Sequence, residues 1–176
     1  MHYPQHIVGI TGVSGSGKTK LLIRLIPIFT RRGYRVATIK HAHHDFEIDK
    51  PGKDSYEHRV AGATEVLVAS TRRWAIIHEN ETPKEATLPE LIARISPSDI
   101  ILVEGFKAAT HPKIEVYRQT LGTEPLYKEN NTIVAIASDV EIPGAHIPVI
   151  DLNDARAITD FILSNFSLPR HPMGVV

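Results

Sequence analysis

The sequence predicts an α/β protein with three layers, in which helices cover a mostly parallel central sheet. Two observations lead to this prediction. Apolar strand-like segments alternate with helical segments at the start and at the end of the chain, an order typical of parallel sheets. A glycine-rich segment, residues 12–19, separates the first predicted strand from the first predicted helix. The 176 residues suit one domain, so we predict a single domain over residues 1–176 with a loose tail at 167–176.

The first elements follow from apolar spacing. The apolar run in residues 6–12 predicts a strand, and residues 18–32 carry apolar side chains at helical intervals. Pro27 falls inside that pattern, so we expect the helix to kink or to end there. Residues 35–40 form a second predicted strand, and residues 55–61 predict one or two helical turns.

The middle of the chain predicts a hairpin and a central strand. Residues 64–70 and 73–79 are β-type runs joined by a very short connection, which favours an antiparallel pair. A short helix is predicted at 88–95. Residues 99–104 include four consecutive apolar residues, typical of a parallel strand covered on both faces. Residues 107–131 hold one β-type run among turn residues, and we expect an arm that packs on a partner subunit.

The last elements return to strand and helix. Residues 132–137 and 147–150 predict two strands. Asn153 or Asp154 is a suitable cap for a final helix that ends near Phe166. Strand and helix therefore alternate to the end of the predicted domain.

Composition excludes several functional classes. Twenty Lys and Arg residues balance twenty Asp and Glu residues, so no net positive field favours a nucleic-acid backbone or an anionic membrane. The absence of cysteine excludes disulfides, thiolate nucleophiles, iron–sulfur clusters and Cys-based zinc sites. No apolar run approaches the length of a membrane span, and the first residues lack the pattern of a secretory signal. We expect a cytoplasmic protein with no nucleic-acid or membrane partner.

The strongest motif is Gly-Val-Ser-Gly-Ser-Gly-Lys-Thr at residues 12–19, a complete G-x-x-x-x-G-K-[ST] phosphate loop. Its glycines allow a tight turn whose backbone N–H groups, with the start of the following helix, hold a polyphosphate. Lys18 is expected to reach the β- and γ-phosphates, and Thr19 to coordinate Mg²⁺. The motif predicts a P-loop NTPase fold and a nucleotide site that includes Gly12, Ser14, Gly15, Ser16, Gly17, Lys18 and Thr19.

Two acidic residues complete the predicted site. Glu104 ends the apolar run at 100–103 and is the candidate to hold Mg²⁺ through water or to orient the attacking water. Asp139 follows the predicted strand at 132–137 and is the candidate to accept the edge donors of guanine. Asp139 therefore favours guanine over other bases. The Asn-Lys pair found before this aspartate in many guanine-nucleotide proteins is missing, so strict selectivity for guanine is not expected.

Residues 40–55 form a polar, histidine-rich segment with three readings. His41, His43, His44 and Asp45 are possible ligands for zinc or nickel, although the spacing is loose. Alternatively, the segment is a switch loop that orders around the γ-phosphate and Mg²⁺, with Asp49 as its acid. A solvated loop is the third reading.

Together these motifs resemble the MobB family, the GTP-binding adapter proteins of molybdopterin-guanine dinucleotide biosynthesis. The resemblance rests on the phosphate loop, on the segment at 40–55 with its Pro-Gly-Lys-Asp-Ser, on Ala-Gly-Ala at 61–63 and on Val-Glu-Gly-Phe-Lys at 103–107. These features occur in the expected order and extend over residues 6–166.

The resemblance implies a homodimer, Mg²⁺-dependent GTP binding and weak GTPase activity beside the guanylyltransferase MobA. It implies catalytic roles for Lys18, Glu104 and Asp49, with Thr19 and Glu104 at Mg²⁺. The hairpin and the arm are then candidate dimer contacts. Position 14 is Ser where many dimeric relatives carry a lysine, which agrees with slow hydrolysis.

Two other functions remain open from the sequence. A small-molecule kinase or ATP-dependent ligase is compatible with the same fold, and substrate-dependent ATP consumption would identify it. A nickel metallochaperone GTPase is compatible with the histidines, and tight stoichiometric Ni²⁺ binding would identify it.

Overall fold

The structure, a computed structural model, describes residues 6–42, 46–82, 84–166 and 168. The chain forms two compact units. The larger unit contains the residues up to His41 and those from Leu88 onward, and residues 42–87 form the smaller unit. The predicted loose tail at 167–176 lies outside the described residues except for Leu168, which is buried.

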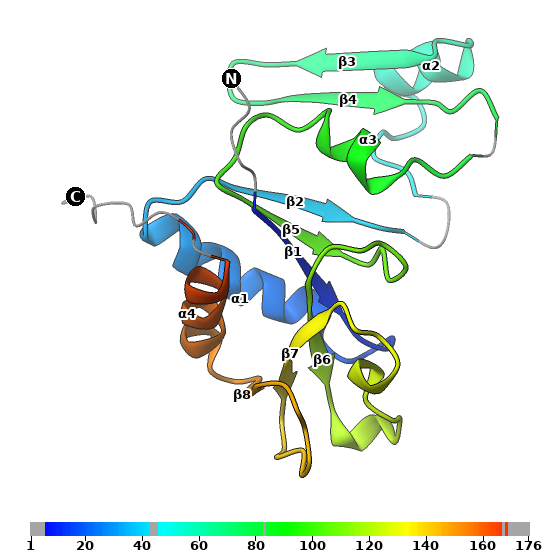
Figure 1. Cartoon of the computed structure of the whole chain (residues 1–176). Helices are drawn as coiled ribbons and strands as arrows, with labels where there is room; N and C mark the ends of the chain where they lie inside the picture. Colours follow the sequence, from blue (N-terminus) through cyan, green and yellow to red (C-terminus); the bar gives the residue numbers. More distant parts are fainter. Residues whose placement is uncertain (1–5, 43–45, 83, 167, 169–176) are drawn as a thin grey trace. The chain divides into compact units, whose positions relative to one another are not determined.

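The larger unit is built on a six-stranded sheet in which every pairing is parallel (Figure 1). The predicted α/β fold with a mostly parallel sheet is therefore confirmed. The strand order is β2-β5-β1-β6-β7-β8, which puts β1 beside both β5 and β6. The strands are β1 (His6–Thr11), β2 (Val36–Lys40), β5 (Ile100–Glu104), β6 (Lys113–Tyr117), β7 (Ile133–Ser138) and β8 (Val149–Asp151).

Helices pack on both faces of this sheet. On one face, α1 (Lys18–Arg31) and α4 (Ala155–Asn165) contribute to the main apolar core. On the other face, α3 (Leu88–Ile92) packs against apolar residues of β2 and β5. The side chains of β5 alternate between the two cores, which confirms that this strand is central and covered on both faces.

Two helix ends differ in how well the sequence predicted them. Asp154 caps α4, because its Oδ1 accepts hydrogen bonds from the backbone N–H groups of Arg156 and Ala157 at 3.0 and 2.9 Å. The expected end at Pro27 does not occur, since α1 continues to Arg31. Phe29, beyond the proline, is fully buried, and its packing favours continuation of the helix.

The prediction that residues 107–131 form an arm on a partner subunit is wrong for β6, which lies inside the central sheet between β1 and β7. The central place of this β-type run was hard to recognise because two of its residues, Lys113 and Glu115, are charged yet buried. Burial lowers the pKa of the Lys113 ammonium and raises the pKa of the Glu115 carboxyl.

Both charged side chains of β6 have hydrogen-bond partners within the larger unit. The Lys113 ammonium donates to the carbonyls of Ala109 and His111 and to the Thr132 hydroxyl. The Glu115 carboxylate accepts from the backbone N–H groups of two consecutive residues, Leu126 at 2.7 Å and Tyr127 at 2.9 Å. The bonds of Glu115 hold the short 3₁₀ turn η2 (Leu126–Lys128), which follows the turn η1 (Gln119–Leu121) after β6.

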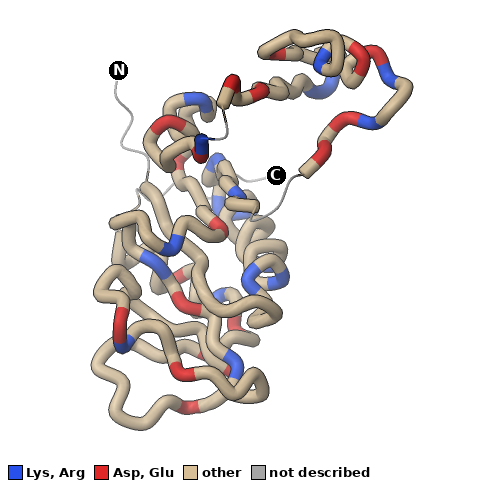
Figure 2. Tube along the Cα trace, turned by 90° about the vertical axis from the view of Figure 1, so that its right-hand side faces the viewer, with Lys and Arg blue, Asp and Glu red and all other residues tan. Residues whose placement is uncertain are grey.

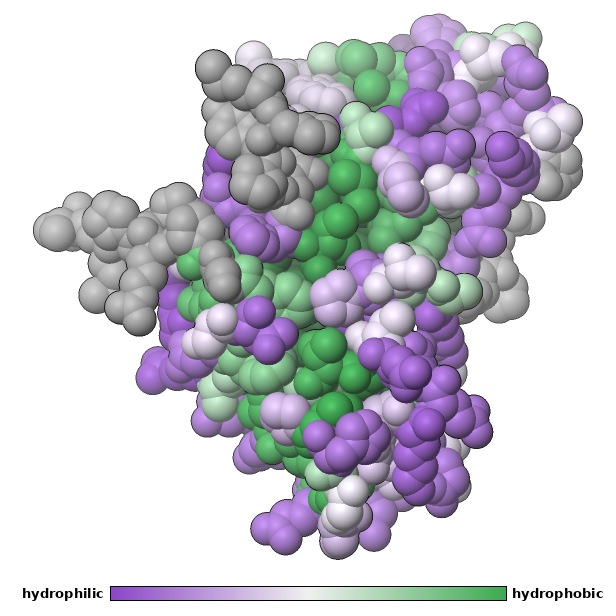
Figure 3. Space-filling model, viewed as in Figure 1, coloured by the Kyte–Doolittle hydropathy of each residue, from purple (hydrophilic) through white to green (hydrophobic). Residues whose placement is uncertain are grey.

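The smaller unit contains α2 (Asp54–Val60) and an antiparallel hairpin of β3 (Glu65–Ala69) and β4 (Trp74–His78), which confirms the predicted hairpin. Its register pairs Leu67 with Ile76 and Ala69 with Trp74, so these side chains share one face. Leu67, Trp74 and Ile76 are all exposed, and apolar surface is visible over the hairpin in Figure 3.

Positively and negatively charged residues are both distributed over the described chain (Figure 2). None of the described helices combines the length and the apolar character that a membrane crossing requires.

Candidate functional site

The phosphate loop lies between the end of β1 and the start of α1, as the motif predicts. Gly12 has a φ of 141°, and a Cβ atom at this position would stand 2.5 Å from the Val116 carbonyl oxygen of β6. Only glycine fits this approach. Gly17 precedes the helix in a left-handed conformation and accepts a backbone hydrogen bond from Leu21, so the loop leads directly into the first helical turn.

Lys18 folds back over the loop. Its Nζ donates to the carbonyl oxygens of Gly12 at 3.0 Å and Val13 at 2.8 Å. Burial lowers the pKa of this ammonium, an effect that the positive charge of Lys107 reinforces and the negative charge of Glu104 opposes. The two hydrogen bonds place the Lys18 ammonium group directly against the loop backbone.

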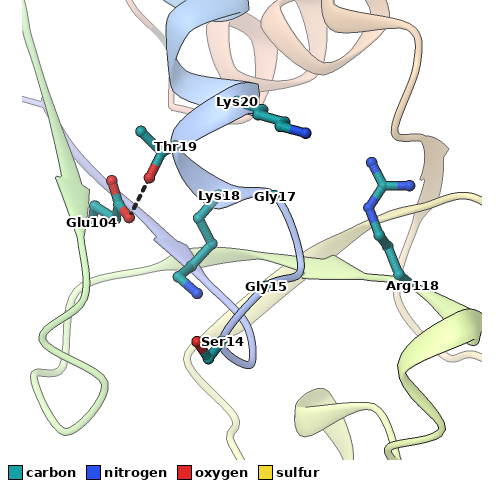
Figure 4. Close-up of a pocket in the computed structure, with 8 residues that line it drawn as sticks. All are labelled: Ser14, Gly15, Gly17, Lys18, Thr19, Lys20, Glu104 and Arg118. Carbon is teal, nitrogen blue, oxygen red and sulfur yellow. Dashed lines mark hydrogen bonds between the residues drawn. The ribbon is translucent and has the colours of Figure 1, made fainter.

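Glu104 lies beside the phosphate loop because β5, which ends at Glu104, is paired with β1, which precedes the loop. Ile10 of β1 is in register with Glu104 of β5, so both carboxyl ends reach the same edge of the sheet. The Thr19 hydroxyl donates to Glu104 Oε1 at 2.8 Å (Figure 4). The two oxygens form a pair of hard ligands of the kind that Mg²⁺ prefers.

The chain turns sharply after Glu104. Gly105 has a φ of 99° and Phe106 a φ of 48°, so two consecutive residues adopt the left-handed conformation. A Cβ atom on Gly105 would lie 2.6 Å from Cβ of His41, and the Phe106 ring stacks on the His41 ring with 4.7 Å between centroids. The Val-Glu-Gly-Phe-Lys motif therefore forms a strained turn that fixes the position of Glu104.

A cavity of about 690 Å³ opens over the phosphate loop (Figure 4). The residues that line it are the predicted loop residues and Glu104, together with two positively charged residues that were not predicted, Lys20 and Arg118. The lining residues are Ser14, Gly15, Gly17, Lys18, Thr19, Lys20, Glu104 and Arg118. Three positively charged side chains around backbone N–H groups suit a polyphosphate ligand.

Arg118 is the functional candidate that the sequence analysis missed. It follows β6 directly, and its Nε donates to the carbonyl oxygen of Ser16 inside the phosphate loop at 2.9 Å. Its Nη1 lies 3.4 Å from Oδ2 of Asp139. The sequence signal was weak, because Arg118 follows a strand in which the charged residues Lys113 and Glu115 interrupt the apolar pattern. Its place at the carboxyl end of a parallel strand, where ligands bind, becomes evident only from the sheet.

Asp139 follows β7 and lines a second cavity, of about 620 Å³, together with Ser138, Asp151 and Asn153. One of its carboxylate oxygens accepts a hydrogen bond from the backbone N–H of Gln119 at 3.1 Å. Arg118 contacts the other oxygen and lines the first cavity, so this ion pair connects one lining residue of each cavity.

Asp49 belongs to the smaller unit. Its carboxylate accepts hydrogen bonds from Arg59 Nε at 3.2 Å and Nη2 at 3.1 Å, and its side chain is almost fully buried. Glu79 pairs with the same guanidinium at 3.5 Å. In this structure Asp49 therefore stabilises the start of the smaller unit, and its proposed role at Mg²⁺ stays a prediction.

The candidate metal ligands His43, His44 and Asp45 lie outside the described residues. Within residues 6–42, 46–82, 84–166 and 168, no three histidine or acidic side chains gather as metal ligands.

Comparison with known proteins bears on these observations. The profile of the family MobB, described as molybdopterin guanine dinucleotide synthesis protein B, matches residues 7–139. The chain belongs to the MobB family. A molybdopterin-guanine dinucleotide biosynthesis adapter protein of Escherichia coli is 44% identical, over 85% of this chain and 87% of its own. The adapter protein of the same name from Haemophilus influenzae is 42% identical, over 89% and 86%.

Solved MobB structures share the fold. A crystal structure of molybdopterin-guanine biosynthesis protein B has a TM-score of 0.73 and 29% identity, and covers 92% of this chain and 99% of its own. A MobB homolog from Bacillus stearothermophilus has a TM-score of 0.70 at 21% identity, with 93% and 99% covered. The resemblance to the MobB family is therefore confirmed.

Proposed function

We propose that this chain is a GTP-binding adapter protein with weak Mg²⁺-dependent GTPase activity. Its adapter role in molybdopterin-guanine dinucleotide biosynthesis follows from the family to which it belongs. The observation that carries the nucleotide proposal is the cavity over the phosphate loop, which Lys18, Thr19 and Glu104 all line.

Each residue of the loop has a chemical task in this proposal. The Lys18 ammonium binds the β- and γ-phosphates, and the loop N–H groups hold the same oxygens. Thr19 and Glu104 fit Mg²⁺, because their oxygens are hard donors that lie 2.8 Å apart at the cavity. The metal would neutralise phosphate charge when bound.

Slow hydrolysis is consistent with the side chains around the cavity. Glu104 is the described carboxylate that lines the cavity, and it is the candidate to orient an attacking water. Ser14 occupies the position where many dimeric relatives carry a lysine, so the chain does not offer that cation to a partner's site. Asp49 remains the candidate acid of a switch segment.

The base is proposed to lie at the second cavity, with Asp139 accepting the edge donors of guanine. A carboxylate has about four acceptor positions, so its bonds to Arg118 and Gln119 leave capacity for a base. Asp139→Asn should reduce the preference for GTP over ATP by about tenfold, because an amide presents only one acceptor oxygen. Fluorescence competition with both nucleotides measures this ratio, and an unchanged ratio would mean that guanine is recognised elsewhere.

A homodimer through the hairpin is the proposed assembly. A two-stranded sheet is only marginally stable alone, and the exposed face of Leu67, Trp74 and Ile76 suits a second copy. Trp74→Asp should weaken the dimer by about tenfold or more, since it places a charge in an apolar interface. Sedimentation velocity measures the dissociation, with exposed Arg72→Ala in the connection as the matched control. A dimer of wild-type strength in the Trp74→Asp variant would contradict this interface.

The proposed protein partners are the guanylyltransferase MobA and other molybdenum-cofactor proteins, in the cytoplasm. Nucleotide turnover by the purified chain tests the central proposal. With Mg²⁺ and no other substrate, GTP should be hydrolysed faster than ATP, at a rate far below the roughly 10 s⁻¹ median of enzymes. Lys18→Ala protein, prepared in parallel, sets the background from contaminating phosphatases. Activity that appears only with an added small molecule would favour a kinase or ligase.

A further inference from the structure

We propose that Arg118 binds the α-phosphate of the nucleotide and that Asp139 positions its guanidinium for this contact. The inference rests on the nucleotide site proposed above and adds a binding residue outside the loop motif. Arg118 reaches the loop from β6, whereas the phosphate-loop residues come from β1 and α1.

The guanidinium is held from two directions. Its Nε is bonded to the Ser16 carbonyl, and its Nη1 pairs with Asp139. The remaining nitrogen, Nη2, donates to none of the residues that the structure describes, and it lies 3.6 Å from the position that a Cβ atom on Gly17 would occupy. The Arg118 side chain is 34% exposed, so Nη2 is available to a ligand that lies beside Gly17 at the end of the loop.

The position of Arg118 determines which phosphate it meets. Figure 4 shows Thr19 and Glu104 on one side of Lys18, and Arg118 on the other side, beside Gly17. The Mg²⁺ ligands mark the β- and γ-phosphate end of the cavity. Asp139 lines the second cavity, where the base is proposed to lie. A nucleotide that extends from the first cavity to the second would pass its α-phosphate beside Arg118, which contacts Asp139.

Arginine suits this place for a geometric reason. Its planar guanidinium donates in three directions at once, so two nitrogens can be anchored while the third binds an anion. Asp139 acts here as a positioning residue, because its carboxylate fixes the plane of the guanidinium. A lysine in this position would supply charge without the second anchor.

Binding of GTP and GDP to Arg118→Ala tests the proposal. Both affinities should fall by about tenfold or more and by the same factor, because both nucleotides carry the α-phosphate. Arg118→Lys should recover part of the loss. Arg156→Ala, an exposed arginine on α4, is the matched control and should bind as the wild type does.

An α-thio analogue of GTP separates direct contact from damage to the loop. Sulfur on the α-phosphate should weaken binding to the wild type and cause no further loss in Arg118→Ala, provided that both proteins melt at the same temperature. Equal sulfur effects in the two proteins, unchanged GTP affinity in Arg118→Ala, or a greater loss for GTP than for GDP would each overturn the assignment. If the wild type itself binds no GTP, the proposed function fails before this inference is tested.

Discussion

Lys18→Ala should lose at least about tenfold in GTP affinity while the protein stays folded. The ammonium is the positive charge whose Nζ bonds to the loop carbonyls of Gly12 and Val13, next to the β- and γ-phosphate positions. A charge-assisted hydrogen bond to phosphate exceeds the strength of a neutral one by about twofold, so its loss is felt directly in binding. Titration calorimetry with GTP and Mg²⁺ measures the change.

The matched control for this variant is Lys20→Ala. Lys20 lines the same cavity two residues further along α1 and is exposed, without a hydrogen bond to the loop carbonyls among the described contacts. It should cost less affinity than Lys18→Ala. Because removal of the Lys18 ammonium also frees two partly buried carbonyls, thermal melts of both variants are needed. Wild-type affinity in a folded Lys18→Ala protein would remove the nucleotide site from this loop.

Phe29→Ala should lower the free energy of unfolding by about 3–5 kcal/mol, the cost of removing a large buried ring and leaving a cavity. Phe29 is fully buried on α1 and packs edge-to-face on Tyr34, with ring centroids 6.0 Å apart. The same helix carries the phosphate loop at its start, so the substitution also loosens the support of the site. Urea denaturation followed by circular dichroism measures the effect.

Ile23→Ala on the same helix is the control for this substitution. Ile23 is 64% exposed, so its truncation should change stability by less than about 1 kcal/mol. Equal losses of unfolding free energy in the two variants would show that α1 does not pack on the sheet through the face that contains Phe29.

Much of the fold could be predicted because its signals are local. The phosphate loop needs only consecutive residues, and the four apolar residues at 100–103 were enough to identify a central strand. The same run placed Glu104 at a strand end, where the structure finds it 2.8 Å from the Thr19 hydroxyl. Short patterns of this kind are predictive because nearby residues determine the backbone geometry of each element.

Arg118 could not be found in the same way. It contacts Ser16 across 102 positions of sequence, and this proximity arises only because β6 pairs with β1. The alternation of Lys113 and Glu115 with apolar residues made β6 resemble a solvated edge. A hydropathy pattern does not reveal buried charges with satisfied hydrogen bonds. The β-type run within 107–131 was therefore recognised, but its place in the central sheet and the role of the arginine after it were not.

The Glu115 carboxylate ties a stretch of irregular backbone to the middle of the sheet. Its two oxygens accept from Leu126 and Tyr127, which lie in a turn without strand partners. Amide hydrogens in exposed turns ordinarily exchange with solvent within seconds to minutes through local opening. Here both N–H groups are released only when a buried carboxylate loses its partners, so their deuterium exchange should follow the unfolding of the sheet itself. In terms of cooperativity, we expect the turn and β6 to open as one unit.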